Sequence, residues 1–201
     1  MVGLVAGALG AEEPAPDSTV ESDLYYAISQ PFEENRKWEI RVATGYDFSD
    51  PYLNVFSVGP AGSLFLSDTV AIGLAANFYK TSERQAAETL RNQLSPFGYE
   101  TIVLKPEYST ALTFRLVPLS GLVNLFSQQV MSAEVALQLH GGMMQYSEVG
   151  RGPLAGTGIE FALGVSPSFG LVSQMLWEFE KPPGHEWKSR AGFRIGPMWR
   201  F

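Results

Sequence analysis

The sequence predicts an all-β fold: an eight-stranded antiparallel up-and-down barrel that spans a membrane, with a short N-terminal extension and one helical loop. Apolar and polar residues alternate with a period of two along eight segments of residues 37–201. The chain has 20 glycines and only 17% charged residues, and no apolar run approaches the roughly 18 residues of a spanning helix. Aromatic residues gather near the ends of the segments, as they do in the interfacial girdles of membrane barrels.

Composition excludes several classes of function. The 201 residues fit one domain with a short appendage, and cysteine is absent, which removes disulfides, thiolate catalysis and cysteine-type zinc sites. The net charge of −7 offers no basic footprint for nucleic acid. No calcium-type loop of oxygen ligands occurs. We therefore expect no metal, no cofactor and no nucleic-acid partner.

The first residues predict export. Residues 1–11 form an apolar stretch that runs into small residues, with Ala8-Leu9-Gly10 as a cleavage site, and we interpret them as a signal peptide remnant. This stretch contains no Lys or Arg, so either the start is misassigned or part of the peptide is missing; a flexible apolar tail is the alternative. Residues 12–36 are polar and contain prolines, which indicates a periplasmic N-terminal segment, and residues 37–201 form the predicted barrel.

The predicted strands follow one another with short turns between most of them. They cover residues 38–48, 52–66, 70–78, 101–116, 130–146, 159–165, 171–180 and 187–201. The last segment has the clearest pattern, because Phe193 and Ile195 share one face while Arg194 and Gly196 share the other.

One segment departs from the period of two. In residues 82–94 the apolar positions are spaced by three and four, Ser82 fits an N-cap, and Gln85 completes a capping-box pattern. This spacing predicts a short helix within a long connection, and a disordered loop of helix-friendly composition remains the alternative. With an even number of strands both chain ends lie on the periplasmic side. The outward connections then contain residues 49–51, 80–100, 147–154 and 181–186, which puts this helix outside the cell.

Alternation alone does not say which face is inside, because a soluble lipocalin-like barrel has the opposite orientation. The non-apolar face here combines glycine and alanine with charges of both signs. Small residues beside a few long ones suit a narrow eight-stranded lumen, and buried charges need partners of opposite sign. We therefore predict a lumen charge network of Glu39, Arg41, Lys105, Glu107, Arg115, Glu134, Glu160, Glu178, Arg190 and Arg194.

The apolar face is predicted to contact the lipids of an outer membrane. Aromatic rings suit the headgroup level of a bilayer. The predicted lipid-facing girdle consists of Trp38, Tyr46, Phe78, Trp177, Trp187 and Trp199.

Some stretches resemble known proteins. Phe193, Ile195, Trp199 and Phe201 share one face and are similar to the signal that the outer-membrane barrel-assembly machinery reads. The stretches 24–30, 117–121 and 135–142, the second in the connection before the fifth strand, resemble the small outer-membrane β-barrels of myxobacteria and Bdellovibrio-type bacteria, which are eight-stranded barrels of the OmpA and OmpX kind. The resemblance implies the outer membrane of a Gram-negative cell and, for some members, an envelope-spanning machine such as a gliding apparatus. It supplies no catalytic residues.

Little chemistry can be assigned to a site. His140 and His185 are the only histidines, and neither stands in the His, one residue, Ser-Asn pattern of lipid A deacylases. His140 is expected on the inward face near Glu134 and Gln138. We predict a non-enzymatic structural or interaction component of the cell envelope, with no catalytic residues. The alternatives are an outer-membrane lipid-modifying enzyme and a soluble lipocalin-like ligand carrier. A diffusion pore is disfavoured, because side chains fill an eight-stranded interior.

Overall fold

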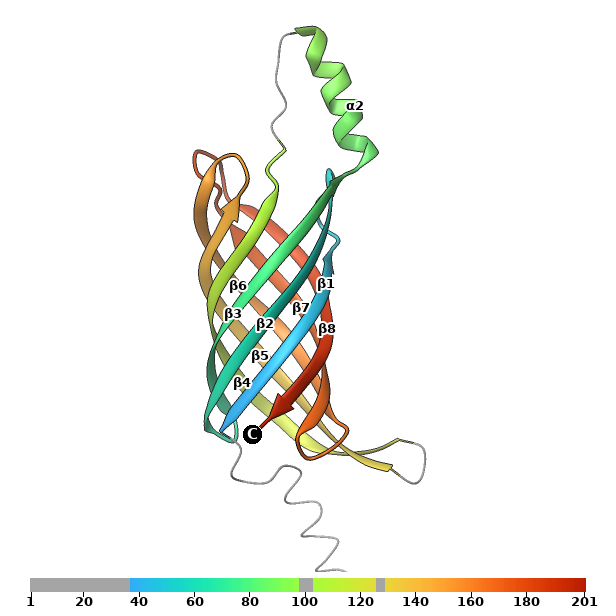
Figure 1. The fold of residues 1–201 in the computed structure, drawn as a ribbon, viewed down its shortest axis with the longest axis vertical. Helices are drawn as coiled ribbons and strands as arrows, with labels where there is room; N and C mark the ends of the chain where they lie inside the picture. Colours follow the sequence, from blue (N-terminus) through green and yellow to red (C-terminus); the bar gives the residue numbers. More distant parts are fainter. Residues whose placement is uncertain (1–36, 98–102, 126–128) are drawn as a thin grey trace, which may run out of the picture. The chain divides into compact units, whose positions relative to one another are not determined.

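The computed structural model describes residues 37–97, 103–125 and 129–201. Within them the chain forms eight strands, one α-helix and a short 3-10 helix (Figure 1). In chain order these are β1 Trp38–Asp47, β2 Leu53–Ser67, β3 Val70–Glu83, α2 Gln85–Leu94, η1 Ser95–Phe97, β4 Pro106–Leu125, β5 Gln129–Tyr146, β6 Gly150–Gly164, β7 Phe169–Glu180 and β8 Lys188–Arg200. The predicted signal peptide remnant and N-terminal segment, residues 1–36, lie outside the described residues.

The strands form one closed antiparallel barrel, which confirms the predicted fold class. Each strand pairs with its neighbour in sequence, and β1 closes the sheet on β8. In that closing ladder Glu39 lies opposite Arg200 and Tyr46 lies opposite Phe193. Closure matters in a bilayer, because backbone N–H and C=O groups that face hydrocarbon must pair with one another.

The two ends of the barrel differ in their connections. One end, here called the turn end, carries the short β2–β3 and β6–β7 connections at residues 68–69 and 165–168. The opposite end, the loop end, carries residues 48–52, 84–97, 103–105, 147–149 and 181–187 (top of Figure 1).

No helix in the described part of the chain is long and apolar enough to cross a membrane.

Several strands run further than the sequence predicts. At the loop end β3 continues to Glu83, and β6 begins at Gly150, so the predicted connections 80–100 and 147–154 are shorter than expected. The start of β6 contains glycine and proline and therefore resembles a loop. Gly152 is required there because a Cβ atom would collide with the Lys181 carbonyl oxygen. The predicted N-cap at Ser82 is wrong: Ser82 pairs with Asn54 in the sheet, and α2 starts after Arg84 without a side-chain cap.

β4 and β5 extend past their neighbours at the turn end. The predicted fourth strand ended at residue 116, and the stretch 117–121 was expected in a connection; the structure places it in β4. Pairing of β4 with β3 stops at Leu116, whereas pairing with β5 continues to Leu125 opposite Gln129. The resulting hairpin leaves the barrel wall at the lower right of Figure 1. We call residues 117–125 and 129–131 the projecting hairpin.

Candidate functional site

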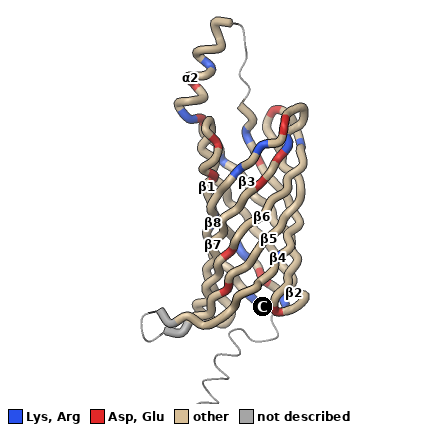
Figure 2. Tube along the Cα trace, turned by 180° about the vertical axis from the view of Figure 1, so that it is seen from behind, with Lys and Arg blue, Asp and Glu red and all other residues tan. Residues whose placement is uncertain are grey.

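Apolar side chains coat the outside of the barrel and charged side chains fill its interior. On β8, Ile195 is 50% exposed while the adjacent Arg194 is 6% exposed, and on β1 the corresponding values are 58% for Trp38 and 1% for Glu39. Figure 2 shows acidic and basic positions gathered at two levels of the strands, with uncharged residues between them. The interior therefore holds two separate groups of charges.

The turn-end cluster consists of three arginines and three glutamates. Its centre is Arg115, whose guanidinium lies 2.8 Å from Glu39 Oε1, 2.7 Å from Glu160 Oε1 and 3.3 Å from Glu134 Oε2. Arg200 donates to both oxygens of Glu134, at 2.7 and 2.6 Å, and to Glu39 Oε2 at 2.8 Å. The members of the cluster are Glu39, Arg41, Arg115, Glu134, Glu160 and Arg200, with Arg41 bound to Glu160.

Formal charges in the turn-end cluster balance, and most donors are paired. This matters because an unpaired charge in a dry interior costs several kcal/mol. Phe65 lies against the cluster, with the Arg115 and Arg200 guanidinium carbons 5.5 and 5.2 Å from its ring centroid. This aromatic ring completes the packing at the turn end.

The loop-end cluster is built around Glu178. Arg190 donates to Glu178 Oε2 at 2.6 Å, Arg194 donates to Oε1 at 3.3 Å, and His140 Nε2 lies 3.3 Å from Oε1. Asp47 and Glu180 lie at 3.3 and 3.6 Å from the Arg190 guanidinium. The structure thus places His140 beside Glu178, and not beside Glu134 as expected. The carboxylate comes from β7, whose register could not be read from the sequence.

Glycines on the inner face make room for these long side chains. A Cβ atom on Gly45 would collide with the stem of Arg194, and one on Gly192 would collide with the Asp47 carboxylate. A Cβ atom on Gly156 would lie 2.5 Å from His140 Nε2 and 2.5 Å from the Trp177 carbonyl oxygen. The glycines of the inner face are therefore steric requirements of the charged lumen.

This requirement gives a test with a matched control. Gly156→Ala is expected to lower the free energy of unfolding by about 1–3 kcal/mol, because the neighbouring backbone oxygen cannot move away freely. Gly141→Ala puts the same methyl group on the outer face, where the nearest atom lies 4.0 Å away, and should change stability by less than about 0.5 kcal/mol. Urea unfolding in lipid vesicles measures both. Equal effects of the two variants would contradict the packing described.

Two residues of the predicted lumen network lie outside it. Lys105 Nζ is 2.8 Å from Glu83 Oε1 at the loop end, and Glu107 is exposed. The register of β4 shifts between Pro106 and Tyr108, and a one-residue shift moves side chains to the other face. Hydrogen bonds from Lys105 and from Arg91 hold the pKa of Glu83 below its usual value. The ion pair between Arg91 and Glu83 joins α2 to the end of β3.

The other residues of the predicted network lie in the lumen. They divide between the two clusters, with Glu39, Arg41, Arg115, Glu134 and Glu160 at the turn end and Glu178, Arg190 and Arg194 at the loop end. The prediction missed Asp47, Glu180 and Arg200, although the alternation itself places them on the inner face. It also left out Phe65, because an aromatic side chain is not expected among charges, although the alternation with Leu64 and Leu66 places it on the inner face.

Five residues of the predicted girdle lie on the outer face of the strands, and Trp187 lies exposed in the β7–β8 connection. Trp38, Phe78 and Trp187 are the most exposed, at 58%, 56% and 56%. Tyr46 packs on Phe56 with ring centroids 5.0 Å apart, and Trp199 packs on Phe169 at 5.8 Å. Trp177 is 37% exposed on β7.

An apolar exterior around a closed, charged interior is the arrangement of a barrel whose solvent is lipid. The chain is an outer-membrane β-barrel. The soluble carrier required the reverse orientation, so the structure contradicts that alternative. Since membrane barrels have short periplasmic turns and longer extracellular loops, we expect the turn end on the periplasmic side and the loop end on the extracellular side.

The similarity of this chain to known proteins is a similarity of fold alone. No family model and no curated protein matches the chain. Among solved structures, the chain is similar to Neisserial surface protein A (13% identity, 83% of this chain and 97% of that one, TM-score 0.46) and the N-terminal β-barrel domain of Pseudomonas aeruginosa OprF (13%, 82% and 97%, 0.43). It is also similar to Ail, the attachment invasion locus protein of Yersinia pestis (11%, 83% and 97%, 0.36). The narrower resemblance to myxobacterial and Bdellovibrio-type barrels gains no support from these structures.

The lumen leaves little room between its side chains. A cavity lined by Asn77, Gln138, His140, Glu178 and Arg194, among others, has a volume of about 10 Å³, which is the space of a single water molecule. Small barrels are expected to be filled in this way. Within the described residues, no three His, Asp or Glu side chains are grouped as metal ligands.

Proposed function

We propose that this barrel is a non-enzymatic structural or interaction component of the cell envelope, which binds other envelope proteins through elements that project from its ends. The observation that carries this proposal is the projecting hairpin. The Val117 N–H still donates to the Thr69 carbonyl oxygen at 2.7 Å. Beyond that point, among the described residues, β4 pairs only with β5.

An unpaired strand edge is a template for another strand. Sheet proteins normally shield such edges, and peptide partners often add a strand to an edge left open. The projecting hairpin also presents apolar side chains, with Leu119 and Val123 64% and 37% exposed. An edge of this kind on the periplasmic side suits a protein partner that is anchored elsewhere in the envelope. An envelope-spanning assembly is the setting we propose.

The enzymatic alternative lacks a comparable observation. A lipid-modifying enzyme of this size would need a histidine on the surface that its substrate reaches. The His140 side chain is 4% exposed and faces Glu178, whereas His185 lies exposed in the β7–β8 connection. We expect the lipid profile of cells to be unchanged by His140→Ala and by His185→Ala.

Insertion by the barrel-assembly machinery is part of the proposal. Phe193, Ile195 and Phe201 are exposed on the outer face of β8 and just after it, at 45%, 50% and 63%. Trp199 lies on the same face. This row is available to a partner in the membrane before the barrel is surrounded by lipid.

Photo-crosslinking in living cells tests the interaction role. A photoreactive residue at position 119 or 123 is expected to give one reproducible protein adduct of defined mass. The same residue at position 139 should give none, because Leu139 is equally apolar, 56% exposed and surrounded by lipid on β5. Heat-modified gel migration checks that each variant is folded. Folded variants that give no adduct at 119 or 123 would contradict the proposed interaction.

A further inference from the structure

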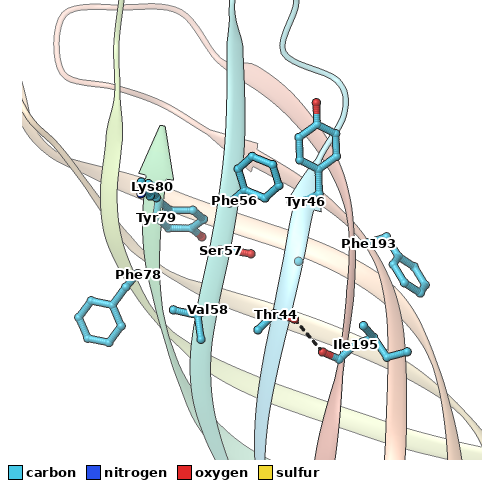
Figure 3. Close-up of a pocket in the computed structure, with 11 residues that line it drawn as sticks. Thr44, Tyr46, Phe56, Ser57, Val58, Phe78, Tyr79, Lys80, Phe193 and Ile195 are labelled. Atoms are coloured by element: carbon cyan, nitrogen blue, oxygen red, sulfur yellow. Dashed lines mark hydrogen bonds between the residues drawn. The ribbon is translucent and has the colours of Figure 1, made fainter. Parts of the chain in front are cut away.

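The outer face of the barrel has a hollow that spans four adjacent strands, β8, β1, β2 and β3. Eight outward side chains form two rows across four adjacent strands, as the ladder partners show. The row nearer the extracellular end is Phe193, Tyr46, Phe56 and Lys80, and the next row is Ile195, Thr44, Val58 and Phe78. We call this region the outer groove (Figure 3). Its volume is about 580 Å³, within the roughly 300–1,000 Å³ of small-molecule sites.

The groove exists because the middle side chains of the second row are short. Thr44 and Val58 lie between the larger Phe78 and Ile195, and in Figure 3 Phe78 and Phe193 stand on opposite sides of this floor. The Thr44 hydroxyl is turned to the backbone, at 3.4 Å from the Ile195 carbonyl oxygen, so the floor presents mainly carbon atoms.

Below the groove, exposed apolar or small residues follow on β1 and β2 toward the periplasmic end. There Val42 lies opposite Pro60, and Ile40 lies opposite Gly62. A Cβ atom on Gly62 would have no neighbour within 4 Å. An apolar floor at Thr44 and Val58, followed along β2 by Pro60 and Gly62, offers room for an extended acyl chain.

The extracellular edge of the groove carries positive charge. Lys80 is exposed on β3 and lies opposite Phe56. Arg84 follows on the same strand end and donates to the Tyr46 hydroxyl at 2.7 Å and to Asn54 Oδ1 at 3.0 Å. Within the described part of the chain, neither Lys80 nor Arg84 has a carboxylate within 4.0 Å. The two cations are therefore held at the headgroup level without a counter-charge from the protein.

An apolar trough below two uncompensated cations complements an anionic lipid. We propose that the outer groove binds one phosphorylated glycolipid of the outer leaflet, with an acyl chain along Thr44 and Val58 and a phosphate at Lys80 and Arg84. Charge-assisted hydrogen bonds to phosphate are stronger than neutral ones. The preference for a phosphorylated lipid follows from Lys80 and Arg84, and the groove supplies the site for the acyl chain of the lipid.

Native mass spectrometry of the purified barrel tests the proposal. Lipid A, dephosphorylated lipid A and net-neutral phosphatidylethanolamine are the three probes. The unmodified chain is expected to retain one lipid A and to bind the dephosphorylated form at least about tenfold more weakly, because that form lacks the phosphate of the charge-assisted contact. Phosphatidylethanolamine keeps a phosphate, but its own ammonium group offsets the negative charge, so it should also bind more weakly than lipid A.

Two variants separate the headgroup from the chain. Lys80→Gln should weaken lipid A binding about tenfold and leave the dephosphorylated form unaffected. Val58→Trp fills the trough and should weaken the binding of both forms. The matched controls are Lys181→Gln, which removes a charge from the β7–β8 connection, and Leu139→Trp, which adds the same ring to the far wall. Equal retention of all three lipids, or equal effects of variants and controls, would mean annular lipid alone and would overturn the proposal.

Discussion

Arg115→Met is expected to lower the free energy of unfolding by about 3–5 kcal/mol, because it leaves buried carboxylates without their counter-charge. Arg115 is 1% exposed and contacts Glu39, Glu134 and Glu160 from three other strands. Methionine has similar length, so the loss is one of charge and hydrogen bonds more than of volume. Urea unfolding in lipid vesicles gives the value from the midpoint and slope.

A control and a rescue distinguish this effect from general damage. Arg151→Met removes an exposed arginine that donates to Gln145 and Tyr108, and it should change stability by less than about 0.5 kcal/mol. Adding Glu160→Gln to Arg115→Met should recover part of the loss, since it removes one of the stranded charges. A double variant that is less stable than Arg115→Met would contradict the role of Arg115 as the counter-charge of Glu160.

Leu139→Arg is expected to destabilise the folded barrel in lipid by about 2–4 kcal/mol, because it places a charge deep in the hydrocarbon. Leu139 is 56% exposed and lies roughly midway along the part of β5 that belongs to the barrel wall, between Phe114 and Thr157 of the neighbouring strands. The measurement is again the unfolding free energy in vesicles.

Trp187→Arg is the matched control for that substitution. Trp187 is also 56% exposed, but it lies in the β7–β8 connection at the extracellular end, where an arginine should cost about 0–1 kcal/mol. A soluble surface would tolerate both changes equally. Equal costs at the two positions would therefore contradict the membrane depth that the structure implies.

The alternation of residues predicted the faces of the strands because each face meets a different solvent. On β8 the alternation put Arg194 and Ile195 on opposite faces, and the small residues and balanced charges on the Arg194 side identified that face as the inner one. Parity fails where the ladder is irregular: the shift between Pro106 and Tyr108 places Glu107 outside the lumen. Pro106 is a local sign of that shift, because proline within a sheet is confined to edges, strand starts and bulges, but it does not say which of these applies.

The ends of the strands and the partners of the charged side chains could not be predicted from the sequence, for a different reason. Both depend on register between strands. Val117-Pro118 has the composition of a turn, yet it continues β4 because β5 pairs with it. Arg115 and Glu39 are 76 positions apart in the chain, and only closure of the barrel brings them together.

The claim that apolar side chains contact lipid while small and charged ones fill the axis can be tested on the unaltered protein. Solid-state NMR in lipid vesicles measures magnetisation transfer from acyl-chain protons to methyl groups. We expect strong transfer to the methyl groups of Leu137 and Leu139, which are 47% and 56% exposed, and none to Ala136 and Val172, each 1% exposed. Transfer to Ala136 and Val172 with none to the two leucines would contradict the orientation of β5 and β7, and with it the claim that the apolar face contacts lipid.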